Sequence, residues 1–204
     1  MAKVVDPEEK RAHIVSAAWQ VVTANGLDAT TMRMIASAAG CTTGMVTHYF
    51  ANKDEILETL VRQVSRQAEH RLTAAVTAAG PGLPGLRALI IESLPLDQER
   101  VAEWRIWLAL WNKSLESGPL SGEWARRDRR WIMLLRNAVD SAIENGTFPA
   151  DTNLDVEVET LSALAFGLAV GALVSPRRVG PATIIDIIDE QLAVKHGEPA
   201  DLGT

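Results

Sequence analysis

The sequence predicts an all-α protein in which a small N-terminal helix-turn-helix domain precedes a larger helical domain, with about nine helices in total. Two observations support this fold class. Apolar residues recur at helical spacing in almost every segment, and no stretch alternates between apolar and polar residues as a strand would. Near Gly40, two short helical segments are joined by a tight turn, which is the helix-turn-helix pattern.

The first helix is expected to begin at Pro7 and to end at Asn25. Asp6 can cap its first turn, with Glu9 as the capping-box partner, and proline is favoured at the first helical position. Gly26 follows, and glycine readily adopts the left-handed conformation that ends a helix. One face of this helix is apolar and should point to the core; its residues are Ile14, Ala17, Ala18, Val21 and Val22.

Two short helices come next. Thr31 is expected to cap the second helix, which ends at Gly40, and Thr42 to cap a third helix that runs through Phe50. A helix fits the major groove of DNA, where Thr hydroxyls and His nitrogens can contact base edges. The outward side chains of the third helix suit that role, and they are Thr42, Thr43, Thr47 and His48. The periodicity alone leaves open a helical hairpin whose outer face is only solvated.

A fourth helix is expected from residue 53 to residue 79, with Asn52 as its cap and Glu55 as the capping-box partner. Lys53 lies in the first turn, where a cation opposes the helix dipole and costs about 0.3–1 kcal/mol. Beside a DNA phosphate, the same lysine and the helix N-terminus would form an anion site, and Thr31 offers a similar arrangement on the second helix. The alternative for Lys53 is an ordinary solvated lysine.

The run Gly80–Gly85 contains the strongest helix breakers of the chain, so we place the domain boundary there. This boundary gives a helix-turn-helix domain over residues 1–55, a connecting helix over 53–79 and a second domain over 80–204. Further helices are expected near residues 84–94, 97–117, 119–146, 153–175 and 181–195. The tail 197–204 is expected to be disordered.

Three tryptophans, Trp104, Trp107 and Trp111, lie on the helix expected at 97–117. Bulky residues at this spacing often form a core. The alternative is the wall of an effector pocket, because aromatic faces bind cations with about 0.5–2 kcal/mol per contact. Arg105 is the polar residue among them, and it needs a carboxylate partner such as Glu103 wherever it is buried.

The last two helices carry wide apolar surfaces, and Gly167 and Gly171 allow close backbone approach on the first of them. Two such helices could cover the core of a monomer. We favour a homodimer in which each subunit contributes both helices, since a dimer can present two recognition helices about one DNA turn apart, roughly 34–36 Å. The residues expected at this interface are Leu161, Ala165, Leu168, Ala172, Ile184 and Ile188.

The composition argues against an enzyme. Four scattered histidines and the single cysteine, Cys41, give no metal-ligand spacing, and the chain has no glycine-rich phosphate loop and no nucleophile motif. We therefore expect no catalytic residue, metal or cofactor. The N-terminus lacks the apolar run of a signal peptide, and the longest apolar stretch is shorter than the roughly 18–20 residues that cross a bilayer. We expect a cytoplasmic protein without a membrane partner.

The net charge of −6 argues against a protein that coats nucleic acid along its length. Residues 1–78 contain eight Lys and Arg and eight Asp and Glu, so the expected DNA-binding part is neutral. A neutral domain can still bind DNA if its cations lie on one side.

The run from Thr31 to Leu57, with Ala-Gly-Cys-Thr-Thr-Gly-Met-Val-Thr-His-Tyr-Phe-Ala-Asn-Lys at its centre, resembles the signature of TetR-family transcriptional regulators. The resemblance implies that Thr31, Tyr49 and Lys53 contact phosphates of a double-stranded operator. It also implies that other side chains face the groove, namely Thr42, Thr43, Met45, Thr47 and His48, with Arg33 as a further contact. Many relatives have Tyr where this chain has Thr47, so the operator sequence does not follow.

The segment from Glu92 to Trp111 is similar to the C-terminal domain of the BetI branch of that family, which responds to choline. This resemblance implies a repressor that leaves a palindromic operator when a small-molecule effector binds. An organic cation is the candidate effector, with Trp104, Trp107, Trp111 and Arg105 as candidate contacts. An architectural DNA-binding dimer of the same fold, without an effector, stays open.

Overall fold

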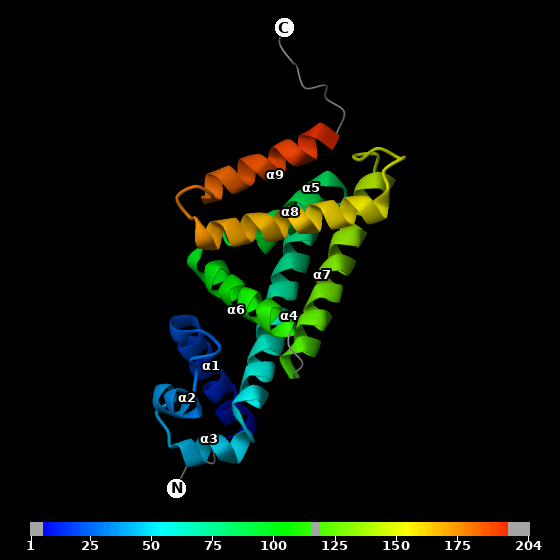
Figure 1. Cartoon of the computed structure of the whole chain (residues 1–204). Coiled ribbons are helices and arrows are strands. Elements are labelled where there is room, and N and C mark those ends of the chain that lie inside the picture. Colours follow the sequence, from blue (N-terminus) through cyan, green and yellow to red (C-terminus); the bar gives the residue numbers. More distant parts are fainter. Residues whose placement is uncertain (1–5, 116–118, 196–204) are drawn as a thin grey trace. The chain divides into compact units, whose positions relative to one another are not determined.

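The structure, a computed structural model, describes residues 6–115 and 119–195, and these residues form α-helices and no strand (Figure 1). The all-α fold class is therefore confirmed. The helices are α1 (Pro7–Asn25), α2 (Met32–Ala38), α3 (Thr43–Tyr49), α4 (Lys53–Ala79), α5 (Leu83–Ser93), α6 (Gln98–Ser114), α7 (Pro119–Glu144), α8 (Leu154–Val174) and α9 (Pro181–Lys195). The expected helix boundaries agree with these within a few residues. Residues 116–117 of the helix expected at 97–117, and the tail 197–204, lie outside the described residues.

The contacts along the chain divide it into two compact units. Unit 1 comprises Met1–Arg66 and Arg105–Arg126, and unit 2 comprises Gln67–Trp104 and Arg127–Thr204. The division passes through α4, α6 and α7, so each of these helices contributes to both units. The boundary that the sequence places at Gly80–Gly85 stays a prediction.

In unit 1, α2 packs against both α1 and α3. The predicted cap of α1 is present, because the Asp6 carboxylate accepts a hydrogen bond from the Glu8 backbone N–H at 3.0 Å. Gly26 follows the last turn with a φ of 84°, and its N–H donates to the Val22 carbonyl at 2.7 Å. The buried face of α1 includes all the apolar residues predicted there: Ile14, Ala17, Ala18, Val21 and Val22.

In unit 2, α5 packs against α9, and α8 contributes a buried apolar face. The residues expected at the subunit interface lie on α8 and α9 of this unit. Five of these six residues are buried inside the protomer, and these are Leu161, Ala165, Leu168, Ile184 and Ile188. Burial of these side chains stabilises unit 2, and their role at a subunit interface stays a prediction. Ala172 is half-buried.

The connection between α4 and α5 depends on glycine. Gly80 and Gly82 have φ values of 87° and 80°, in the left-handed region that side chains with a Cβ rarely adopt. A Cβ at Gly85 would overlap the Gly80 carbonyl oxygen. The first N–H groups of α5 are held by hydroxyl groups, since the Gly82 N–H donates to Ser141 at 3.2 Å and the Leu83 N–H donates to Thr147 at 3.0 Å. The start of α5 is therefore fixed to residues 141–147.

Helix α8 has two apolar faces. Among the described helices it alone is long and apolar enough to cross a membrane by length and composition, a test that core helices of soluble proteins also pass. One face lies in the core of unit 2. The other exposes Val156, of which 60% is accessible, and Val174, of which 71% is accessible. An apolar face that the protomer leaves open is typical of a surface that contacts another protein.

Candidate functional site

Helix α3 is held at its N-terminus and along one side. The predicted cap is present, because the Thr42 hydroxyl accepts a hydrogen bond from the Met45 backbone N–H at 3.1 Å. Val46 and Phe50 are buried and anchor the inner side of the helix. Gly40 has a φ of 62°, which permits the tight turn between α2 and α3. The other side of α3 is left in solvent.

The residues expected to contact DNA lie on this outer side of α3 and at the starts of α2 and α4. Thr31 caps α2 by accepting a hydrogen bond from the Met34 N–H at 3.2 Å. Seven of the expected residues are exposed, and these are Thr31, Arg33, Thr42, Thr43, Met45, Thr47 and His48. Tyr49 and Lys53 are half-buried. The ring of Tyr49 lies edge-on to His48 with 5.0 Å between centroids, and Lys53 Nζ lies 3.5 Å from the Asp28 carbonyl oxygen.

Sequence reasoning missed Arg11, which links α1 to the end of α3 and the start of α4. Its guanidinium donates to the Tyr49 carbonyl, pairs with the Glu55 carboxylate at 3.3 Å and lies 4.2 Å from the centroid of the Phe50 ring. Glu55 also accepts a hydrogen bond from the Ala51 N–H at 2.8 Å, and its own N–H donates to Asn52 at 2.9 Å, as the capping box predicted. In the sequence, Arg11 stands one helical turn before Ile14, which is buried. This spacing puts Arg11 on the same side of α1 as the core residues, and it was the signal that could have found it.

Two ion pairs within unit 1 join its α6 and α7 segments to the loop between α1 and α2 and to α4. Lys113 of α6 pairs with Asp28, in the loop between α1 and α2, at 3.2 Å. Arg62 of α4 pairs with Glu123 of α7 at 3.3 Å, and Glu123 is buried.

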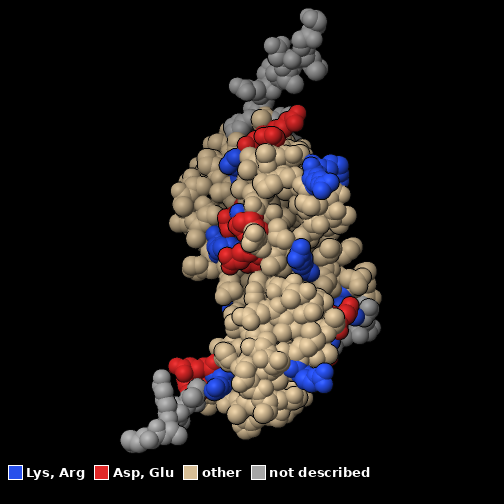
Figure 2. Space-filling model, turned by 90° about the vertical axis from the view of Figure 1, so that its left-hand side faces the viewer, with Lys and Arg blue, Asp and Glu red and all other residues tan. Residues whose placement is uncertain are grey.

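Charged side chains of both signs are interspersed on the face drawn in Figure 2, where the described residues form no continuous basic surface. This agrees with the neutral N-terminal part found in the sequence.

In unit 2, Trp104 is buried and contacts groups from three segments. Its indole N–H donates to the Ser93 carbonyl at 2.7 Å, and the ring lies edge-on to Phe166 of α8 with 5.8 Å between centroids. The guanidinium of Arg127 lies 5.6 Å from the centroid of the Trp104 ring. Removal from water lowers the pKa of Arg127 to about 10, although the charges of Asp128 and Glu103 act in the opposite direction. The Trp104 ring thus already has a cation of the protein as its neighbour.

The other expected effector contacts lie in unit 1. Trp107 is buried there, whereas Arg105 is exposed and Trp111 is 39% accessible. Helix α6 is therefore enclosed on fewer sides than its apolar sequence suggested. Because Arg105 is exposed, its charge does not carry the free-energy cost of burial.

Glu103 has a different partner from the one considered in the sequence. Arg71 of α4 holds the Glu103 carboxylate with two hydrogen bonds of 2.6 and 2.9 Å, and it also donates to Glu92 of α5 at 2.9 Å. Arg100 donates to Glu92 at 3.2 Å and to Asp97 at 2.8 Å. Glu103 is 5% accessible, and its hydrogen bonds to Arg71 hold the pKa of that guanidinium well above its usual value. This ion network, made of Arg71, Glu92, Arg100 and Glu103, ties α4, α5 and α6 together within unit 2.

Two family models match separate parts of the chain. The model of bacterial regulatory proteins of the tetR family matches residues 14–60. The model of the C-terminal domain of BetI-type transcriptional repressors matches residues 82–195, which is more than half of the 204 residues.

Individual proteins are similar over nearly the whole chain. The HTH-type transcriptional regulator PksA of Bacillus subtilis is 28% identical over 190 residues, which cover 92% of this chain and 90% of that protein. The HTH-type transcriptional regulator BetI of Vibrio parahaemolyticus is 26% identical over 198 residues, which cover 94% and 96%. A transcriptional regulator from Saccharomonospora viridis, solved in complex with choline, superposes with a TM-score of 0.86, covers 91% of this chain and 96% of its own, and is 22% identical. This last likeness shows a common fold.

Proposed function

Because the chain belongs to the TetR family of transcriptional regulators and has a C-terminal domain of the BetI type, we propose that it represses transcription in the cytoplasm from a palindromic operator. In this proposal a homodimer binds double-stranded DNA and leaves it when a small molecule binds the C-terminal part. The observation that carries the DNA-binding role is the geometry of α3, which is anchored by Val46 and Phe50 and leaves its hydroxyl and imidazole side chains in solvent.

We propose that the protein makes two kinds of contact with the operator. Thr31, Tyr49 and Lys53 lie at the starts of α2 and α4 and at the end of α3, where they would hold phosphates. The groove-facing residues would be Thr42, Thr43, Met45, Thr47 and His48, with Arg33 as a further contact. Phosphate contacts fix the position of the protein on DNA, whereas base contacts select the sequence.

We assign the subunit interface to the outer face of α8, opposite the face that forms the core. Gly167 is exposed on this face, and a Cβ there would meet no atom within 4 Å, so the backbone is open to close approach. Residues spaced three or four apart form one stripe along the helix. This outer stripe consists of Val156, Thr160, Ala163, Gly167, Val170 and Val174. It explains why α8 is apolar on the side that the protomer does not cover.

Replacing Ala163 with Glu should convert the dimer into a monomer, because two carboxylates would be desolvated at the centre of the outer stripe. The side chain is exposed in the protomer, so folding should be retained. Sedimentation velocity at micromolar concentration would measure the mass, and Ala74→Glu, at an exposed position of α4, is the matched control. A dimeric Ala163→Glu protein would exclude this face as the interface.

We propose an organic cation as the effector, with choline as the first candidate, and place its cationic group at the Trp104 ring. Aromatic faces attract quaternary ammonium groups, and the ring already neighbours the Arg127 guanidinium. A ligand cation that took this place would return Arg127 to water, where its charge is better solvated. This assignment concerns Trp104 alone, since Trp107, Trp111 and Arg105 belong to unit 1.

Choline should weaken binding of the wild-type protein to DNA from upstream of its own gene, and Trp104→Leu should raise the choline concentration needed by about tenfold. The reason is the loss of a cation–π contact of about 0.5–2 kcal/mol. Fluorescence anisotropy of labelled DNA would measure the release. The matched control is Trp131→Leu, because Trp131 is also a hydrogen-bonded tryptophan of unit 2, donating to Ser162 at 2.9 Å. An unchanged response in Trp104→Leu would remove Trp104 from the effector site.

A further inference from the structure

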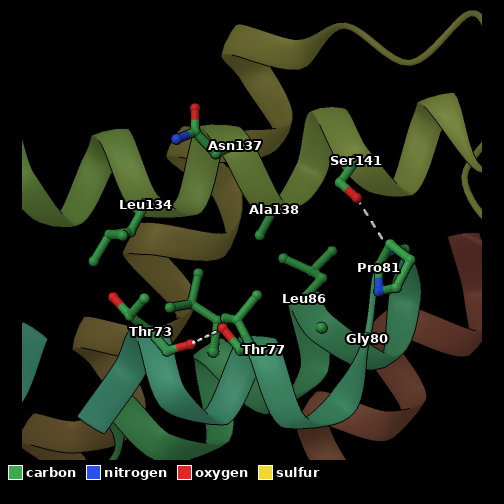
Figure 3. Close-up of a pocket in the computed structure, with 13 residues that line it drawn as sticks. Thr73, Thr77, Gly80, Pro81, Leu86, Leu134, Asn137, Ala138 and Ser141 are labelled. Atoms are coloured by element: carbon green, nitrogen blue, oxygen red, sulfur yellow. Dashed lines mark hydrogen bonds between the residues drawn. The ribbon is translucent and has the colours of Figure 1, made fainter. Parts of the chain in front are cut away.

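A pocket of about 210 Å³ lies in unit 2 between the last turns of α4, the start of α5 and the middle of α7 (Figure 3). Leu134 and Ala138 of α7 point toward Leu86 of α5 and Thr73 of α4 across this space. The pocket contains none of the residues assigned above to the effector, the operator or the subunit interface. It is therefore a separate place at which a molecule can bind.

The walls of the pocket are mainly apolar, carry no charge and include four polar side chains, Thr73, Thr77, Asn137 and Ser141. Leu86 and Leu89 are fully buried, Ala138 is buried, and Val76 and Leu134 complete the apolar lining. No lining residue is Lys, Arg, Asp, Glu or His. A charged ligand would lose its hydration without gaining a counter-charge, so the lining favours an uncharged molecule.

Among the polar side chains of the lining, Ser141 lies at the start of α5. Its hydroxyl oxygen accepts hydrogen bonds from the Gly82 N–H at 3.2 Å and from the Asn145 amide at 3.5 Å. Among the hydrogen bonds of the described residues, the Ser141 hydroxyl donates none. Since a hydroxyl can donate one hydrogen bond in addition to those it accepts, its proton can be offered to an acceptor in the pocket.

The volume limits the size of the occupant. A dry cavity of about 150 Å³ is known to hold benzene, so about 210 Å³ suits one ring with a few further atoms. We propose that this pocket binds a small uncharged molecule with an apolar body and one oxygen acceptor, such as a phenol, an alcohol or a ketone. The molecule would contact α4, α5 and α7 together and would stabilise the glycine-dependent connection between α4 and α5.

The full-length protein would be titrated by calorimetry with 4-ethylphenol, 4-ethylbenzoate and choline as uncharged, anionic and cationic probes. We expect saturable binding of 4-ethylphenol with one site per chain, and at least tenfold weaker binding of 4-ethylbenzoate at this site. Ala138→Leu should fill the space and weaken 4-ethylphenol at least tenfold. Ala78→Leu is the matched control, because Ala78 is exposed on α4 and does not line the pocket. Thr73→Phe, at an exposed wall position, provides a second filled variant if Ala138→Leu does not fold.

A bound probe should also raise the melting temperature of the wild-type protein and not that of the filled variant. Choline is expected to bind both proteins equally, since its proposed place is at Trp104. The proposal is overturned if 4-ethylphenol does not saturate, if a folded filled variant binds it as tightly as the wild type, or if the anionic probe competes for the pocket with equal affinity. None of these outcomes depends on DNA binding, so a failure here is distinct from a failure of the repressor role.

Discussion

Arg71→Ala is expected to lower the free energy of unfolding by about 3 kcal/mol, which is the lower end of the range for breaking a buried ion pair. Arg71 holds both oxygens of Glu103, whose side chain is nearly inaccessible to water. Without the guanidinium, that carboxylate would stay buried without its counter-charge. The lower end of the range applies because Arg71 itself keeps part of its surface in water. Urea unfolding followed by circular dichroism would measure the change.

Two further proteins would separate the charge effect from the loss of packing. Adding Glu103→Gln to Arg71→Ala should recover part of the lost stability, because the amide removes the isolated charge. Arg87→Ala breaks an ion pair with Asp189 of similar geometry, 2.5 Å long, in which both side chains are largely exposed. It should therefore cost at most about 1 kcal/mol. Equal losses in Arg71→Ala and Arg87→Ala would contradict the role assigned to the ion network.

His48→Ala is expected to weaken operator binding by roughly 30-fold or more. A good contact to a base edge contributes about 1–3 kcal/mol, and a homodimer makes it twice, so the dimer would lose about 2–6 kcal/mol. His48 is exposed on α3, so its removal should leave folding unchanged. Fluorescence anisotropy at fixed salt concentration would give the affinity.

The matched control for this substitution is His70→Ala, because His70 is an exposed histidine of α4 outside the proposed DNA interface. The affinity for unrelated DNA should fall little in both proteins, since groove contacts select the sequence and phosphate contacts supply most of the sequence-independent binding. A His48→Ala protein that retained full operator affinity would show that α3 does not read the DNA through this side chain.

The fold could be predicted to a large extent because helix starts and ends are local features. Thr31, Thr42 and Asn52 cap their helices through hydrogen bonds that span three residues, and such spacings are visible in a sequence. Gly26 ends α1 for an equally local reason. The outward side of α3 followed from the same periodicity, and the structure buries Val46 and Phe50 on the opposite side.

The network around Glu103 could not be predicted, because its partners come from distant parts of the chain. Arg71 precedes Glu103 by 32 residues, and nothing in the local sequence distinguishes it from the exposed arginines of α4. Arg127 belongs to a run of charged residues, 126–130, yet it lies beside the buried Trp104. The helical spacing of Trp124 and Trp131, on either side of Arg127, was the signal for its inward position.

The sequence did not show which face of α8 is buried in the protomer, and the reason is physical. Both faces are apolar, so hydrophobicity cannot distinguish the side that packs in the protomer from the side left open. The two glycines illustrate this point. A Cβ at Gly171 would lie 3.2 Å from Val179, whereas one at Gly167 would meet no neighbour. The difference between the surroundings of Gly171 and Gly167 is visible only in the folded structure.

The open side of α8 has a consequence for how the regulator responds to its own abundance. In the dimer proposed above, association removes that apolar surface from water, so the folded protein would be more stable when its concentration is high. At low copy number a larger fraction would exist as single chains with the surface accessible to chaperones and proteases. Active repressor would then fall more steeply than total protein, and a modest drop in synthesis would release the operator sharply.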